Sequence, residues 1–411
     1  MEASMMTLVE RHAYKPTDEE YAELDRLCYL SKNLYNATLY AVRQHFFNTG
    51  EYLGYNKINA DFTHQDQPDY RALPAKVSKL TQMLVDKAFK SFFALLRAKK
   101  DGKLDEDYIV RIPKYLDCVK GRQVVEYTRQ ALSFVETGFV KLSGTEIRIP
   151  TKREQVKFVR VVPKENKVIM VEVGYKQPVE YRETGNTAAI DIGINNLATV
   201  ASDSFTPFIV NGKPLKAVNQ FYNKRLAEFK SKQDLSGGKH KTTNRISSLT
   251  RKRNAKVDDY LHKASREITN HLVSNDVNVL VIGYNKGWKQ DVNLGRVTNQ
   301  KFVQIPFLRF IQMLVYKCAL SGILVITRNE SYTSKCSFLD DENVCKHESY
   351  QGRRLKRGLF RSSDGTTINA DVNAAYNILK LHLQEKVAWN LEKFKNCVEV
   401  CSTPAVFTVK L

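Results

Sequence analysis

The sequence predicts an α+β fold of several domains, in which a small β-barrel with an inserted helical segment precedes an α/β domain. The chain has 411 residues, enough for two or three domains with cores of their own. Helical periodicity runs through residues 16–107, and period-two patterns with frequent turns follow over residues 108–182. From residue 183 onward, buried strands alternate with helices, which indicates parallel strand pairing.

The composition excludes several classes of protein. Hydrophobic residues make up 43% and aromatic residues 10% of the chain, so general disorder is excluded. No apolar run reaches the ~18 residues that span a bilayer, and the N-terminus lacks the basic and apolar regions of a secretion signal. The 7 cysteines are odd in number and mostly scattered, which argues against a disulfide framework. We therefore expect a cytoplasmic protein with no membrane partner.

Two long helices are predicted within residues 16–107. Thr17 and Glu20 are spaced as a capping box at the start of the first helix, and the second follows Pro74. A loop over residues 48–73 separates them. The second helix has a lysine-rich face, which is either solvated or in contact with a nucleic-acid backbone.

Short strands with frequent turns over residues 108–182 favour a small barrel. The strand-like segment at residues 7–14 can join this barrel. The two helices would then be an insertion between barrel strands.

The charge balance indicates a polyanionic partner. Lys and Arg number 64 against 44 Asp and Glu, a net charge of +20, which favours nucleic acid over a membrane surface. Much of the excess lies in residues 219–266, where Gly237 and Gly238 separate two basic helices. A solvated helix face normally mixes both signs, so we expect this segment to contact a nucleic-acid backbone. Its candidate residues are Lys224, Arg225, Lys241, Arg245, Arg251, Lys252, Arg253 and Lys256.

Three carboxylates accompany buried segments of the α/β region. Asp191 lies in a strand of small and β-branched residues over 187–200, Glu330 ends a later strand, and Asp371 opens a helix. A buried carboxylate is costly unless a cation neutralises it, and three on one core could hold the metal ions of a phosphodiesterase. Taken alone, the Asp-x-Gly at position 191 is more often a turn at a strand end.

These residues resemble the TnpB family of transposon-encoded, RNA-guided DNA nucleases, which are related to type V CRISPR effectors. The resemblance rests on Asp191-Ile-Gly-Ile, the late pair of buried strands and Asn369-Ala-Asp371-Val-Asn-Ala-Ala-Tyr-Asn-Ile, and it covers nearly the whole chain. It implies a wedge β-barrel, a helical recognition lobe and an RNase H-like (RuvC) nuclease domain. The implied partners are two Mg²⁺ ions, a guide RNA from the transposon end and a double-stranded DNA target, in a prokaryotic cytoplasm near the nucleoid.

The resemblance also implies domain boundaries. The wedge barrel would comprise residues 1–15 and 108–182, and the helical lobe residues 16–107. The remaining ranges are 183–330 and 369–390 for the nuclease domain, 331–368 for a basic, irregular insert that binds target nucleic acid, and 391–411 for a C-terminal tail.

The chain departs from the family pattern at the middle carboxylate. The family usually carries this acid where this chain has Gly283, and no acid follows until Asp291. Glu330 ends the neighbouring strand, about 5 Å away in a sheet, and its side chain can bridge that offset.

We therefore expect Asp191, Glu330 and Asp371 to be the catalytic residues and the Mg²⁺ ligands. Asp364 and Asn369 would be their supporting partners. If Glu330 is only a surface residue at a strand end, the chain would instead be a nuclease-inactive, RNA-guided DNA-binding repressor.

The second departure concerns zinc. Many relatives have two Cys-x-x-Cys pairs between the last two carboxylates, whereas this chain offers Cys336, Cys345 and His347 there. Cys397 and Cys401 lie outside the interval. Four ligands at finger spacing are missing, so we expect no structural zinc. The insert instead carries arginines suited to a phosphate backbone, among them Arg353, Arg354 and Arg357.

In the RNA-guided nucleases that the chain resembles, the guide pairs with the target and the protein reads only a short duplex motif. The polar candidates for that reading lie in the helical lobe and are Asn36, Tyr40, Lys76, Lys79 and Gln82. A DNA transposase with an RNase H-like core is a further alternative, but its last acid is typically Glu, whereas this chain has Asp371. The sequence does not determine the oligomeric state.

Overall fold

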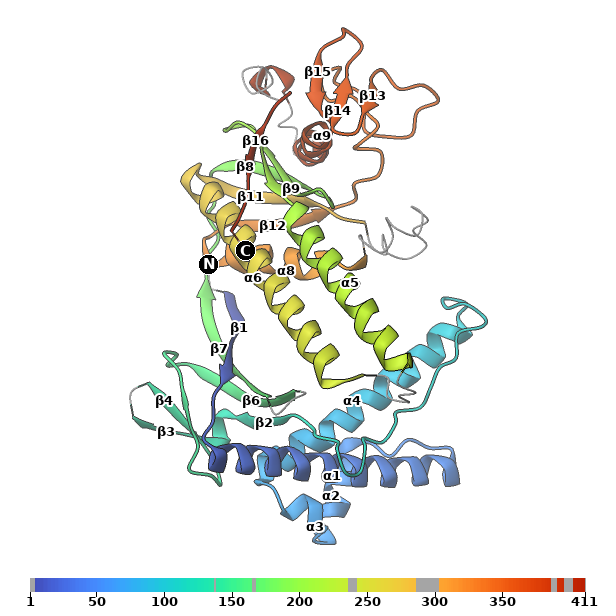
Figure 1. The fold of residues 1–411 in the computed structure, drawn as a ribbon, viewed down its shortest axis with the longest axis vertical. Helices are drawn as coiled ribbons and strands as arrows, with labels where there is room; N and C mark the ends of the chain where they lie inside the picture. The colour runs from blue at the N-terminus through green and yellow to red at the C-terminus, as the bar shows by residue number, and fades with distance from the viewer. Residues whose placement is uncertain are drawn as a thin grey trace. The chain divides into compact units, whose positions relative to one another are not determined.

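The chain folds into two compact units, Met5–Pro178 and Val179–Leu411. They are seen in a computed structural model that describes residues 4–136, 138–164, 168–235, 242–285, 303–385, 390–394 and 402–410 (Figure 1).

The strands of the N-terminal unit form two antiparallel sheets. The four-stranded sheet has the order β1 (Ser4–Tyr14), β7 (Val168–Val179), β6 (Val156–Lys164) and β2 (Val125–Thr128). The three-stranded sheet contains β3 (Leu132–Glu136), β4 (Phe139–Leu142) and β5 (Arg148–Pro150). The N-terminal strand β1 joins the larger sheet, as predicted.

The predicted closed barrel is not seen among the described strands. Closure requires the two edge strands of a sheet to hydrogen-bond to each other, and here β1 and β2 remain edges. Strand β2 has only 4 residues, and the short 3₁₀ helix Arg129–Ala131 ends it before the chain enters the second sheet. The barrel prediction was therefore wrong in its closure, although the strands themselves are present.

Helices α1 (Asp18–Thr49) and α4 (Ala75–Lys100) are the two long helices that the periodicity predicts. The capping box is confirmed, because the Glu20 amide donates to Thr17 Oγ1 at 3.2 Å and the Thr17 amide donates to Glu20 Oε2 at 2.9 Å. The loop predicted between them was wrong in part, because it holds α2 (Tyr55–His64) and α3 (Pro68–Arg71). These helices and both sheets share one hydrophobic core.

The C-terminal unit is built on a mixed six-stranded sheet. Its order is β12 (Leu324–Arg328), β11 (Val277–Gly283), β8 (Asn186–Ile192), β9 (Asn196–Ser202), β10 (Phe208–Asn211) and β16 (Ala405–Phe407). Strand β11 pairs in parallel with both β8 and β12, as the strand–helix–strand pattern predicts, whereas β8, β9 and β10 are antiparallel. Part of the predicted tail thus forms the edge strand β16, which pairs in parallel with β10.

Helices cover both faces of this sheet (Figure 1). Ile190 and Ile282 point to the face covered by α6 (Asn244–Ser274) and α8 (Phe307–Leu320). Ala189 and Val281 point to the opposite face, covered by α9 (Ala370–Glu385). Helix α5 (Lys213–Leu235) contacts α6. Among the described helices, none has an apolar stretch long enough to cross a membrane.

The insert at residues 331–368 is more ordered than its sequence predicts. It contains a three-stranded antiparallel sheet of β13 (Arg353–Lys356), β14 (Leu359–Arg361) and β15 (Thr367–Asn369). Phe360 and Phe338 anchor the insert on α9, and the Phe338 ring stacks on Tyr376 with the centroids 4.5 Å apart. This packing explains the order, because aromatic burial supplies the stability that the charged stretch lacks.

Candidate active site

The sheet and α9 bring the three predicted carboxylates together from distant parts of the chain. Asp191 is on β8 and, because side chains alternate along a strand, it shares the α9-covered face with Ala189. Glu330 follows the end of β12, and Asp371 lies in the first turn of α9.

The carboxylates are close enough for their charges to act on one another. The pKa of Asp191 is raised well above its ordinary range, first by burial and then by the negative charges of Asp371 and Glu330. The guanidinium of Arg354 acts in the opposite direction. Repulsion of this kind is relieved when a cation binds between the carboxylates.

The side chain of Glu330 occupies the space beside Gly283. A Cβ atom at position 283 would lie 2.9 Å from Glu330 Oε2, 3.3 Å from Glu330 Cβ and 2.5 Å from Ile378 Cδ1. The parallel register pairs Gly283 with Arg328, so Glu330 leaves the neighbouring strand just beyond the last paired residues. The Glu330 side chain therefore lies directly against the space that a side chain at position 283 would take.

Glu330 is held by its backbone, while one oxygen of its carboxyl group is buried without a hydrogen-bond partner among the described residues. The Glu330 amide donates to Asn285 Oδ1 at 3.1 Å, and Thr333 Oγ1 donates to the Glu330 carbonyl at 2.8 Å. Glu330 Oε2 is buried and makes no hydrogen bond, and burial raises the pKa of this residue to about 7. A buried acceptor left unsatisfied costs about 1–3 kcal/mol, which a bound cation would offset.

Asp371 is positioned by two asparagines. Asn369 Oδ1 caps α9 by accepting from the amides of Asp371 at 3.0 Å and Val372 at 3.3 Å. Asn196 Nδ2 donates to Asp371 Oδ2 at 2.7 Å. Sequence reasoning proposed Asn369 but missed Asn196, although Asn196 closes the same short turn that contains Gly193.

Asp364, the other proposed supporting residue, serves a turn of the insert instead. Its carboxylate accepts from the Thr366 amide at 2.8 Å and from Thr366 Oγ1 at 3.0 Å. These bonds lower the pKa of Asp364, with the largest contribution from Ser362. Asp291 lies outside the described residues.

Arg354, predicted to contact a phosphate backbone, approaches the carboxylates directly. It lies on the exposed strand β13, with its guanidinium 3.6 Å from Asp371 Oδ1. Arg353 and Arg357 are also exposed on the insert.

The donor set suits a hard divalent cation. Mg²⁺ takes carboxylate oxygens, and Asp191, Glu330 and Asp371 provide them on one face of the sheet. Among the described residues, no three His, Cys, Asp or Glu side chains are gathered closely enough to enclose a metal ion as they stand. The three carboxylates therefore form an open acidic centre that a cation would have to draw together.

Comparisons with known proteins find related sequences over both parts of the chain that carry the three carboxylates. Residues 168–289 match the model of the probable transposase family OrfB_IS605, and residues 307–378 match the TNB domain of Cas12f1-like proteins. The TnpB-like protein ORF457 of the Acidianus two-tailed virus is 23% identical over 409 residues, covering 89% of this chain and 84% of the relative. The chain is TnpB-like.

A solved structure shares the fold of this TnpB-like chain. It is a Cas12f1–sgRNA–target DNA complex, with a TM-score of 0.55 at 15% identity, covering 88% of this chain and 83% of the Cas12f1 chain. At this identity the likeness concerns the fold alone. The predicted TnpB resemblance and the mixed α+β, multidomain class are thus confirmed.

The basic helices of the TnpB-like chain expose most of their predicted contact residues. The exposed ones are Lys224, Arg245, Arg251, Lys252 and Lys256. Arg225 is paired with Glu228 at 2.6 Å. Lys241 lies outside the described residues.

Arg253 is part of the helix packing. Its guanidinium donates to Asn219 Oδ1 and to the Gln304 carbonyl, both at 2.7 Å, and burial lowers its pKa. These contacts leave it less available to a phosphate than its exposed neighbours.

Of the five motif-reading candidates, Asn36 is hydrogen-bonded within the protein and Gln82 is buried. Asn36 Nδ2 donates to the Leu116 carbonyl and Asn36 Oδ1 accepts from the Leu116 amide, both at 2.9 Å. The Gln82 side chain is 1% exposed. Tyr40 is 59% exposed, Lys76 is exposed and Lys79 is half-buried.

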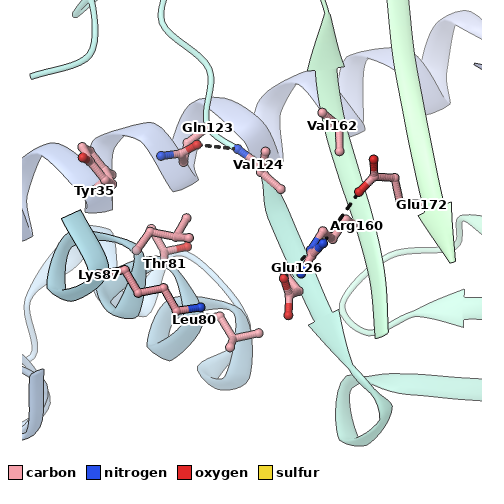
Figure 2. Close-up of a pocket in the computed structure, with 11 residues that line it drawn as sticks. Tyr35, Leu80, Thr81, Lys87, Gln123, Val124, Glu126, Arg160, Val162 and Glu172 are labelled. Atoms are coloured by element: carbon pink, nitrogen blue, oxygen red, sulfur yellow. Dashed lines mark hydrogen bonds and ion pairs between the residues drawn. The ribbon is translucent and has the colours of Figure 1, made fainter. Parts of the chain in front are cut away.

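A cavity of about 440 Å³ lies beside the helical segment of the N-terminal unit (Figure 2). None of the five candidates lines it. Its lining includes Lys87 and Arg160 together with Glu126 and Glu172, and Arg160 Nε donates to Glu126 Oε2 at 2.5 Å. Its charges are balanced, so it does not resemble a simple phosphate site.

The three potential zinc ligands lie along one irregular segment of the insert. Cys345 Sγ is 3.3 Å from His347 Nε2, and Cys336 Sγ donates to the Cys345 carbonyl at 3.5 Å. Cys397 and Cys401 lie outside the described residues. The absence of structural zinc remains a prediction.

The stability of the metal-free protein should depend on Glu330. Its pKa rises from 4.5 to about 7 on folding, so the folded state binds the proton more tightly than the unfolded state does. Between these values the free energy of unfolding falls as pH rises, and Glu330 should contribute about 1–3 kcal/mol to that fall. Urea denaturation in EDTA at pH 5 and pH 8 should show the loss, and Glu330→Gln should flatten it.

Glu267→Gln, at an exposed position on α6, is the matched control and should keep the unmodified pH dependence. Parallel pH profiles for Glu330→Gln and the unmodified protein would contradict the assigned environment of Glu330.

Proposed function

We propose that this TnpB-like chain is an RNA-guided DNA endonuclease whose RuvC-type centre consists of Asp191, Glu330 and Asp371. The observation that carries the proposal is the placement of Glu330. Its Oε2 is buried without a hydrogen bond to any described residue and lies 2.9 Å from where a Cβ at position 283 would be, which supports a centre of three carboxylates rather than two. The similar Cas12f1 structure contains a guide RNA and target DNA, which supports the same partners here.

Asp191, Glu330 and Asp371 would hold two Mg²⁺ ions. When bound, these ions lower the pKa of the attacking water and stabilise the departing 3′ oxygen. The protein supplies the positions of the ligands: β8 carries Asp191, α9 carries Asp371, and Asn196 orients the Asp371 carboxylate. Arg354 would exchange its contact with Asp371 for a phosphate of the scissile strand, because a guanidinium pairs well with phosphate oxygens.

A nuclease-inactive repressor of the same family is the second candidate. It would bind guide and target without using Glu330. The buried Glu330 Oε2, which has no hydrogen bond to the described residues, disfavours this alternative, because such a group costs stability and has no use in a protein that only binds. The matching OrfB_IS605 family is described as a probable transposase, which keeps the transposase alternative in view. Nothing in the site geometry favours it over the nuclease.

Glu330→Gln should abolish cutting while sparing binding. The amide keeps the shape of the side chain but removes the charge, so transition-state stabilisation of several kcal/mol is lost and cleavage of a matched duplex should fall about 100-fold or more. Asp191→Ala should have the same effect. Both variants should retain guide and target in a gel-shift assay with Mg²⁺.

The geometry allows a sharper companion experiment. Gly283→Ala should displace the Glu330 carboxyl and impair cutting, because the added Cβ would lie 2.9 Å from Oε2. Gly283→Glu combined with Glu330→Ala returns the acid to β11 and should recover part of the activity. Near-normal cutting by either Glu330→Gln or Gly283→Ala would place the third ligand elsewhere, and guided binding without any cutting by the unmodified protein would support the repressor.

The basic helices should bind the nucleic-acid backbone. Replacing Lys224, Arg251, Lys252 and Lys256 with Gln should reduce the slope of log affinity against log salt by about 0.9 for each duplex phosphate that the protein no longer neutralises. The measurement is target binding across a salt series. Lys232→Gln with Lys263→Gln is the matched control, because those ammonium groups already pair with Glu228 and Asp259. An equal slope in both variants would assign these helices to solvent.

A further inference from the structure

Helix α9 buries three polar side chains on the face that it turns toward the insert. Asn373, Asn377 and Lys380 are each 0% exposed, at the i, i+4 and i+7 spacing of one helix face. Buried polar groups are costly unless they are hydrogen-bonded, so their partners show what this face holds.

Lys380 pairs with the Asp341 carboxylate and donates to the Glu342 carbonyl at 3.1 Å, whereas the two asparagines bond to backbone atoms just beyond Glu330. Asn373 Nδ2 donates to the Cys336 carbonyl at 2.8 Å, and Asn373 Oδ1 accepts from the Phe338 amide at 2.9 Å. Asn377 Nδ2 donates at 2.8 Å to the carbonyls of both Thr333 and Cys336. These contacts bind the start of the insert to α9 independently of its side chains.

A continuous set of hydrogen bonds leads from Asn377 to Glu330. Asn377 holds the Thr333 carbonyl, while Thr333 donates to the Glu330 carbonyl through Oγ1 at 2.8 Å and through its amide at 3.3 Å. Tyr332, inside this turn, has φ = 67°, a left-handed conformation that costs a bulky residue about 1 kcal/mol. The turn is therefore held by its contacts and not by local preference.

The location of Glu330 explains why such support is needed. An acid at position 283 would be fixed by its strand, whereas Glu330 lies beyond the last paired residues of β11 and β12. A ligand on a loop is imprecise unless surrounding hydrogen bonds fix it. Asp371 lies on the same helix, six residues before Asn377, which is about 9 Å along the axis.

Resting on the proposed function, we infer that Thr333 and Asn377 are positioning residues that fix Glu330 relative to Asp371 through α9. Neither touches the reacting atoms. The side-chain amide of Asn377 donates two hydrogen bonds through Nδ2, whereas its Oδ1 is buried without a partner among the described residues.

The test is Thr333→Val, which keeps the shape of this buried side chain and removes its donor. Thr333→Ser restores the hydroxyl, and Asn377→Leu removes the other bond in case one variant does not fold. Thr269→Val is the matched control, because Thr269 is a buried threonine on α6, against the other face of the sheet, whose Oγ1 donates to the Ser265 carbonyl at 2.8 Å. The probe is Mn²⁺ alone, titrated into the full chain and followed by electron paramagnetic resonance, with Asp191→Ala defining specific binding.

Thr333→Val and Asn377→Leu should weaken Asp191-dependent Mn²⁺ binding by about 10-fold or more, as loss of support around a metal ligand typically does. Thr333→Ser should bind normally, and the melting temperature of Thr333→Val should match that of Thr269→Val. Unchanged Mn²⁺ affinity in Thr333→Val would overturn the inference while leaving the nuclease proposal in place. Absence of Asp191-dependent Mn²⁺ binding in the unmodified protein would instead overturn the proposed function, and this inference with it.

Discussion

The arrangement of the candidate centre depends on one steric fact: Gly283 has no side chain, and Glu330 occupies the space that a side chain there would take. A Cβ at position 283 would lie within 3.3 Å of two atoms of Glu330. Because β11 and β12 are parallel neighbours, a residue just past the end of one strand can reach the position normally served by the other. A missing acid in the sequence therefore does not mean a missing carboxylate in the site.

The position of Glu330 beyond a strand end has consequences for the surrounding structure. A carboxylate on a strand inherits its position from the sheet, but one beyond a strand end needs separate support. In this protein the support comes from Asn285 on one side and from the Thr333 turn, tied to α9, on the other. Helix α9 thus carries Asp371, buries the sheet face below it and holds the segment that follows Glu330.

The insert that follows Glu330, residues 331–368, connects the candidate centre to an exposed basic surface. Its small sheet is anchored through Phe338 and Phe360, and it presents Arg354 to Asp371. The basic side chains of the insert and of α5 and α6 belong to the same compact unit as the acidic centre. A single folded unit thereby combines cationic surface for a polyanion with anionic ligands for a cation, which is the charge pattern that metal-dependent cleavage of nucleic acid requires.

The sequence by itself determined what depends on neighbouring residues. The capping box at Thr17, the helical and strand periodicities and the place of Asp191 on a largely buried strand follow from local spacing and hydrogen bonding, and each is seen in the structure. Only the tertiary structure decided the rest. The contact between Glu330 and Gly283 depends on the register of β11 against β12, and the hydrogen bond from Asn196 to Asp371 joins residues 175 positions apart. Likewise, Asn36 and Arg253 look like free polar groups until the fold supplies Leu116 and Gln304 as their partners. Such long-range pairings are set by packing across the sheet and between helices, and no local pattern encodes them.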